Sequence, residues 1–107
     1  MHYGYKRANI ARVPSHRIHP LALDQLRDLA RHERRTVLDA VDKYLTHEPE
    51  KESKSRIKRL RGYSVPAYRL RISDLRVYHT IERQTVTIHG IAPKDHQDEW
   101  LFTHGTP

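Results

Sequence analysis

Three arginines are spaced so that their side chains gather on one surface. Residues 68–72 alternate between apolar and basic, which places Arg69 and Arg71 on the same side of an extended strand. Residues 73–74 form a turn signal, and alternation resumes with Arg76, so we expect Arg71 and Arg76 to lie near each other. Guanidinium groups bind phosphate bidentately and neutralise developing negative charge. The trio is therefore a candidate phosphate clamp; solvation, or pairing with an acidic protein partner, is the alternative.

The charge distribution favours a polyanionic partner. The chain has 107 residues and a net charge of +7, and residues 51–76 alone hold nine basic against two acidic side chains. Concentrated positive charge of this kind is the footprint expected for nucleic acid. Within this block, Lys58 and Arg61 are candidate contacts to an RNA backbone. A solvated loop is the other interpretation of the same residues.

Composition excludes several classes of protein. The chain has no cysteine, so a disulfide scaffold and a thiol nucleophile are ruled out. No apolar run approaches the ~18 residues of a membrane span, and we expect a cytoplasmic protein with no membrane partner. The nine histidines show neither the HxxxH nor the HExxH spacing of a zinc site. We expect no metal and no cofactor.

The elements that must position these arginines follow from periodicity. Residues 15–19 are bracketed by prolines and predict an edge strand. Residues 21–47 predict a helical hairpin with its break at 32–35, and residues 51–62 a basic loop leading into a short strand. A three-stranded antiparallel meander follows over 68–89, with His79 on its apolar side. The fold class is α+β in a single small domain, with residues 1–15 as a basic, flexible N-terminal arm and residues 16–107 as the folded part.

The motifs of this meander are similar to those of a known family. Leu60-Arg61-Gly62, the stretch Tyr68-Arg69-Leu70-Arg71-Ile72-Ser73-Asp74-Leu75-Arg76-Val77 and the tail Ile91-Ala92-Pro93-Lys94-Asp95 with Trp100 resemble the RelE/ParE toxin superfamily of bacterial toxin–antitoxin modules. The resemblance extends from about His16 to Trp100. It implies a toxin that is held inactive by an antitoxin protein, in a hetero-oligomer.

The two branches of this superfamily differ in their targets. The resemblance to the RelE-like branch, which we favour, implies a ribosome-dependent mRNA endoribonuclease: the ribose 2′-hydroxyl attacks the adjacent phosphorus without a metal and leaves a 2′,3′-cyclic phosphate. The ParE-like branch instead implies a DNA gyrase inhibitor without catalysis. An inactive family member that only binds its antitoxin is the third reading. Fold alone does not choose among them.

The resemblance also suggests residue roles. It places Arg69, Arg71 and Arg76 at basic positions of the active branch, Lys94 at the position that assists the leaving group, and Trp100 at an aromatic that contacts the nucleotide. A lone Trp is equally at home in a core, so both interpretations of Trp100 stay open. Arginine does not accept a proton at neutral pH, so the acceptor must lie elsewhere. His96, close to Lys94 in sequence, is the first choice and His89 the second.

Overall fold

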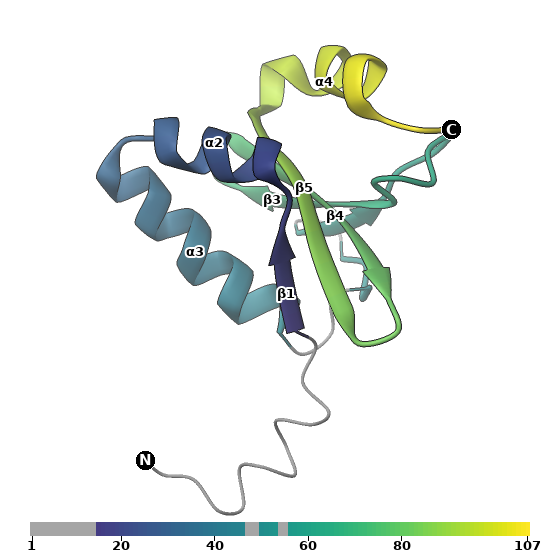
Figure 1. Cartoon of the computed structure of the whole chain (residues 1–107), viewed down its shortest axis with the longest axis horizontal. Helices are drawn as coiled ribbons and strands as arrows, with labels where there is room; N and C mark the ends of the chain where they lie inside the picture. The colour runs from purple at the N-terminus through teal and green to yellow at the C-terminus, as the bar shows by residue number, and fades with distance from the viewer. Residues whose placement is uncertain (1–14, 47–49, 54–55) are drawn as a thin grey trace, which may run out of the picture.

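The computed structural model describes residues 15–46, 50–53 and 56–107 (Figure 1). The elements in chain order are β1 (Ser15–Ile18), α2 (Pro20–Asp28), α3 (Arg31–Leu45), β2 (Ile57–Arg59), β3 (Tyr68–Ile72), β4 (Leu75–Glu82), β5 (Thr85–Pro93), the 3₁₀ turn η1 (Lys94–His96) and α4 (Gln97–His104). This α+β order confirms the predicted N-terminal strand, helix pair and meander. Of the predicted N-terminal arm, residues 1–14 lie outside the described residues and Ser15 begins β1.

The strands form one five-stranded sheet in the order β1-β5-β4-β3-β2. Four neighbouring strands are antiparallel, while β1 runs parallel to β5 (Figure 1). A parallel pair needs a long crossover connection, and the helices α2 and α3 lie in the chain between β1 and the rest of the sheet. The predicted edge strand is correct, but its pairing with the last strand is a non-local feature.

The break between the two helices lies at Leu29–Ala30, so the predicted break at residues 32–35 is wrong. The Glu33 side chain accepts a hydrogen bond from the Ala30 backbone N–H at 3.3 Å, as an acidic residue in a first helical turn commonly does. Arg34 donates to the Leu29 carbonyl at 3.2 Å. The polar stretch therefore begins α3 instead of separating the helices.

The main core lies between the helix pair and one face of the sheet. Its buried residues are Ala22, Leu26, Val37, Val41, Leu45, Ile57, Leu70, Ile72, Val77, Val86, Ile88 and Ile91. His79 is fully buried and its ring stacks on Tyr68 with the centroids 5.5 Å apart, which confirms that it faces the core. None of the described helices is long and apolar enough to cross a bilayer.

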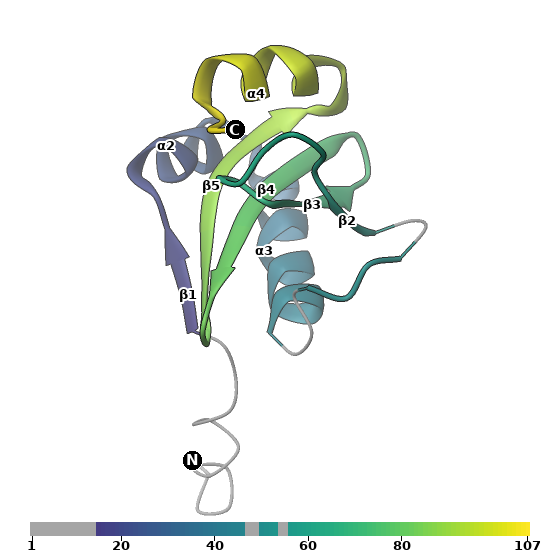
Figure 2. The same ribbon diagram turned by 90° about the vertical axis from the view of Figure 1, so that its right-hand side faces the viewer.

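A second, smaller core lies on the other face of the sheet, where α4 packs (Figure 2). It consists of Leu60, Tyr78, Ala92, Trp100 and Leu101. The pattern of residues 97–104 did not predict α4. The helix buries only the adjacent pair Trp100 and Leu101, which leaves no helical period to detect. We call the sheet face that is turned away from α2 and α3 the open face.

Candidate functional site

The three arginines of the meander share the open face, as predicted. Arg69 is the register partner of Tyr78, and Arg71 is the register partner of Arg76. Partners in an antiparallel ladder project to the same side. Tyr78 belongs to the small core under α4, and so does Ala92, the partner of Arg76 on β5. The trio therefore occupies the sheet surface beside α4.

These guanidinium groups are close enough to influence each other. Burial lowers the pKa of Arg69, and the charges of Arg76 and Arg71 lower it further. Within the described part of the chain no carboxylate forms an ion pair with any of the three. The open face thus concentrates positive charge that no described carboxylate pairs with directly, although burial raises the pKa of Tyr78 on the same face and Asp98 on α4 lies close enough to raise it further. Unpaired positive charge of this kind favours the binding of an anion.

Both Arg76 and Lys94 contact the turn at Ser73–Asp74. The Arg76 guanidinium donates to the carbonyls of Ser73 at 3.2 Å and Leu75 at 2.9 Å, which fixes it at the turn. The backbone N–H of Lys94 donates to the Asp74 carbonyl at 2.8 Å, and its Nζ lies 3.5 Å from Asp74 Oδ1. The first residue of η1 is therefore held against the same turn as Arg76, which brings together residues 18 positions apart in sequence.

His96 is the last residue of this η1 turn and lies immediately before α4. Its side chain is exposed, as is that of Lys94. The structure thus places His96 at the end of the sheet where Lys94 meets the β3–β4 turn. No contact joins its imidazole to the arginines.

His89, the other candidate acceptor, lies farther along the open face. The register of β4 and β5 shifts between Tyr78 and His79, which leaves His89 opposite no residue of β4. Its Nε2 lies 2.7 Å from Thr80 Oγ1. Burial lowers the pKa of His89, and the neighbouring His19, whose ring centroid is 6.2 Å away, lowers it further. His89 lines a groove of about 680 Å³ with Arg59 and Glu82.

Trp100 lies in the small core rather than on the surface. Its side chain is 7% exposed, and its ring stacks on Tyr78 at a centroid distance of 4.5 Å and an interplanar angle of 19°. The His104 ring, also on α4, packs on the indole with the ring centroids 5.0 Å apart. Of the two interpretations left open by the sequence, the structure shows Trp100 as a core residue, with no exposed face on which a base could stack.

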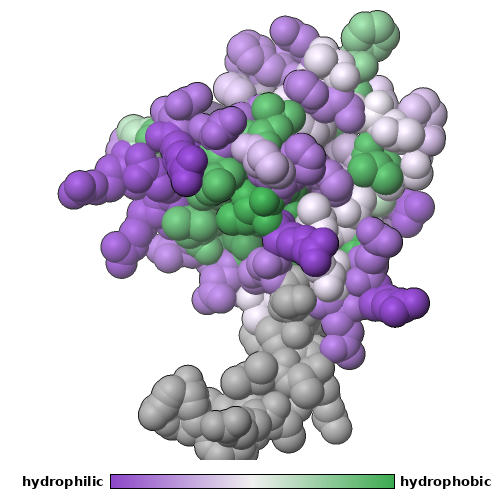
Figure 3. Space-filling model, viewed as in Figure 1, coloured by the Kyte–Doolittle hydropathy of each residue, from purple (hydrophilic) through white to green (hydrophobic). Residues whose placement is uncertain are grey.

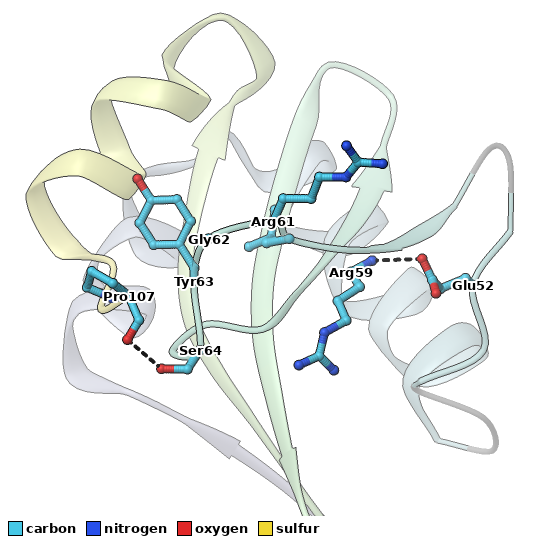
Figure 4. Close-up of a pocket in the computed structure, with 8 residues that line it drawn as sticks. Glu52, Arg59, Arg61, Gly62, Tyr63, Ser64 and Pro107 are labelled. Atoms are coloured by element: carbon cyan, nitrogen blue, oxygen red, sulfur yellow. Dashed lines mark hydrogen bonds between the residues drawn. The ribbon is translucent and has the colours of Figure 1, made fainter.

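The basic block continues the open face toward β2. Lys58 is exposed and is the register partner of Arg69. Arg61 lines a cavity of about 630 Å³ together with Arg59, Gly62 and Tyr63. Figure 4 shows the guanidinium groups of Arg59 and Arg61 pointing in opposite directions from this segment. Arg59 belongs to the basic run of residues 51–61 within the same block, and the structure places it in the lining of this cavity.

Solved structures share this architecture. The crystal structure of the archaeal RelE–RelB complex from Pyrococcus horikoshii OT3 matches with a TM-score of 0.62 and 25% identity, over 76% of this chain and 94% of that one. The fold is RelE-like. The RelB–RelE antitoxin–toxin complex from Methanococcus jannaschii matches the same fold with a TM-score of 0.60 and 14% identity, over 78% of this chain and 96% of that one.

The structural likeness of this RelE-like chain to toxins of toxin–antitoxin modules agrees with the resemblance of its motifs. No protein-family model matches the sequence, and no curated protein does. Among the described residues, no three His, Asp or Glu side chains gather as metal ligands.

Proposed function

We propose that this RelE-like chain is the toxin of a toxin–antitoxin module and cleaves mRNA on the ribosome in the cytoplasm. The observation that carries the proposal is the convergence of Arg69, Arg71 and Arg76 on the open face, with Lys94 held at the same turn as Arg76. These four cationic side chains come from β3, β4 and η1. Together they form a positively charged surface that suits the phosphate of a nucleic acid.

The reaction we propose needs no metal. The ribose 2′-hydroxyl attacks the adjacent phosphorus, loses its proton to an acceptor and forms the 2′,3′-cyclic phosphate. The bond from phosphorus to the 5′ oxygen breaks, and that oxygen takes a proton to become a 5′-hydroxyl. Arg71 and Arg76 bind the phosphate and stabilise the negative charge of the phosphorane, and Lys94 donates to the leaving oxygen. Arg69, Lys58 and Arg61 hold the flanking RNA backbone.

The proton acceptor in this proposal is His96. It follows Lys94 by two residues and shares the η1 turn, so it lies at the same end of the open face as Arg76. His89 remains the second candidate. Its lowered pKa keeps its imidazole neutral at pH 7, as an acceptor requires, but it lies beside Thr80, away from the β3–β4 turn.

One observation favours a different function. All three positions on the open face are arginines, and none of the described imidazoles contacts them. A ParE-like inhibitor of DNA gyrase, or an inactive family member that only binds its antitoxin, needs no acceptor. Both alternatives retain the basic face as a protein-binding surface.

The partner we propose is an antitoxin, because the two matching structures are RelE–RelB complexes. Figure 3 shows apolar side chains gathered on the helical side of the molecule. Ile18 and Leu38 are exposed large apolar residues, on β1 and α3. An amphipathic antitoxin helix placed there, with an acidic segment over the open face, would cover both surfaces.

The test is primer extension on a reporter mRNA after induction of this chain without antitoxin. Discrete cuts within translated codons are expected, and they should disappear with Arg76→Ala but persist with Arg31→Ala, a change at the exposed start of α3. Intact mRNA with growth arrest would refute the nuclease and favour gyrase inhibition. Intact mRNA with normal growth would favour the inactive family member.

A further inference from the structure

The groove of about 680 Å³ that His89 lines is separate from the arginine trio. Thr80 on β4 and Thr87 on β5 are register partners and lie in its lining, together with Glu82. The loop between β2 and β3 completes the lining with residues from the stretch 64–67. Of these residues the proposed cleavage reaction uses only His89, as the second candidate acceptor, so the groove has no role in that reaction as a site.

Hydrogen bonds hold the loop side of this groove in place. The backbone N–H groups of Ser64 and Val65 donate to the Thr106 carbonyl at 2.8 and 3.3 Å, and the Thr106 N–H donates back to the Val65 carbonyl at 2.7 Å. The Ala67 N–H donates to the His79 carbonyl on β4 at 3.2 Å. The loop is therefore tied both to the C-terminal segment and to the sheet, so the groove is formed before a ligand binds, as ligand sites usually are.

The charges in the groove balance, unlike those of the arginine trio. Its charged lining consists of two cations and two carboxylates: Arg59, Arg83, Glu50 and Glu82. His89 adds no charge at pH 7, because burial lowers its pKa and the neighbouring His19 lowers it further. Anions are attracted to surfaces of net positive charge. The groove therefore suits a neutral polar ligand, whereas the trio suits a phosphate.

The groups in the groove match a flat ring with polar edges. The His89 imidazole is half-buried, with Nε2 2.7 Å from Thr80 Oγ1 and the His19 ring stacked beside it at an interplanar angle of 29°, so its orientation is fixed. Val65, on the loop side, is an apolar residue that is 40% exposed. The Thr87 hydroxyl can both donate and accept. Unstacked nucleobases are recognised by stacking on aromatic rings, histidine included, and by hydrogen bonds to their edges.

We propose that this groove binds one unstacked nucleobase of the RNA strand, stacked on His89 and hydrogen-bonded at its edge by Thr87. Thr80 follows Arg76 by four residues on β4, which is about 13 Å along a strand. The groove and the arginine trio share the open face, so one strand occupies both, with a phosphate at the trio and a nearby base in the groove. His89 is then a binding residue. The inference rests on the proposed function in taking RNA as the ligand.

The test measures whether binding depends on a base. The probe is a short 2′-deoxy oligonucleotide with a fluorescent dye at its 5′ end, which this reaction does not cleave because the attacking 2′-hydroxyl is absent. A matched series lacks one base at each position in turn. Binding to the full chain is followed by fluorescence anisotropy. Removal of the base that occupies the groove should raise the Kd roughly ten-fold, because the stacking contact is lost while every phosphate is kept.

Two variants locate that base in the groove. His89→Ala removes the ring, and Thr87→Val removes the hydroxyl while it keeps the side-chain shape. Each variant should weaken binding of the intact oligonucleotide, His89→Ala by roughly ten-fold and Thr87→Val by less. Neither should change the Kd of the oligonucleotide that lacks the critical base. The control is Thr36→Val on α3, on the far side of the sheet, which should retain the full effect of base removal.

The proposal is overturned if the oligonucleotide does not bind, if no single base affects the Kd, or if the effect of base removal stays complete in both groove variants. The nuclease assay is decided separately by primer extension. Base-dependent binding with intact mRNA would support the groove and refute cleavage. Discrete cuts in mRNA without base-dependent binding would support cleavage and refute the groove.

Discussion

Arg71 and Arg76 are register partners on neighbouring strands, so two guanidinium groups of like charge face the same side of the sheet. Like charges placed directly opposite each other destabilise a sheet. The Arg76 guanidinium turns toward the carbonyls of Ser73 and Leu75, which offsets part of the repulsion. The pair is therefore costly in the free protein, and a bound phosphate relieves that cost.

Arg71→Gln is expected to stabilise the protein while it removes cleavage. The substitution ends the cross-strand repulsion, and the free energy of unfolding should rise by about 0.2–1 kcal/mol. Urea denaturation of the two proteins measures the difference. The matched control is Arg17→Gln, an exposed strand arginine whose register partner is Thr87, and it should change stability by less. A loss of stability in Arg71→Gln would show that the pair is not repulsive.

Gly90→Ala should separate α4 from the sheet. The added methyl group would overlap the Trp100 indole, and overpacking of this kind costs about 1–3 kcal/mol. Because Trp100 is the single tryptophan, its emission should shift to longer wavelength as the ring becomes exposed.

The control for Gly90→Ala is Gly62→Ala. Gly62 has φ +81°, which strains any other residue, but a Cβ there contacts nothing within 4 Å. This change should therefore destabilise the chain by about 1–2 kcal/mol without altering the Trp100 emission. An unchanged emission in Gly90→Ala would mean that α4 does not depend on the close approach to Gly90.

The parts of the fold that sequence patterns predicted are the ones set by local periodicity. Leu70 and Ile72 face the core while Arg69 and Arg71 face away, as the alternation of residues 68–72 requires. The pairing of β1 with β5 depends on contacts between residues some 70 positions apart, which no local pattern encodes. The helix α4 is short and buries two adjacent residues, so its sequence shows no helical period of apolar residues. It was not predicted for that reason.

The candidate site likewise has features that the local sequence predicts and features that it does not. The arginine trio was predictable because one turn connects its two strands. The resemblance assigned a role to Lys94 but not its position against Asp74. That position depends on the hydrogen bond from the Lys94 backbone N–H to the Asp74 carbonyl, just after the end of β5, and no local pattern encodes it. The burial of Trp100 was not predictable, because it requires the space left by Gly90 and a stacking partner in Tyr78.

His89 should make the stability of the protein depend on pH. Burial and the neighbouring His19 lower the pKa of His89 in the folded state, whereas the unfolded chain protonates near 6.5. As the pH falls below about 6.5, the unfolded state binds more protons than the folded state, so stability decreases until the pH is below the folded pKa.

His89→Gln should reduce this loss of stability. Glutamine does not titrate, so the difference between the free energies of unfolding at pH 7 and pH 5 should become smaller than in the wild type. Urea denaturation at a series of pH values measures it, with His32→Gln, an exposed change on α3, as the control. Equal pH profiles for the wild type and His89→Gln would contradict the lowered pKa.

The salt dependence of RNA binding should report which cations touch the backbone. Each phosphate neutralised on a single strand contributes about −0.7 to the slope of log K against log salt. Lys58→Gln and Arg61→Gln should each weaken the binding of a non-cleavable oligonucleotide and reduce the magnitude of this slope by about that amount. Lys43 lies on α3 over the Tyr44 ring, on the far side of the sheet, so Lys43→Gln should leave the slope unchanged. Fluorescence anisotropy at four or five salt concentrations measures all four proteins. A slope that falls equally in all three variants would mean that the chain attracts RNA by its total charge and not through the open face.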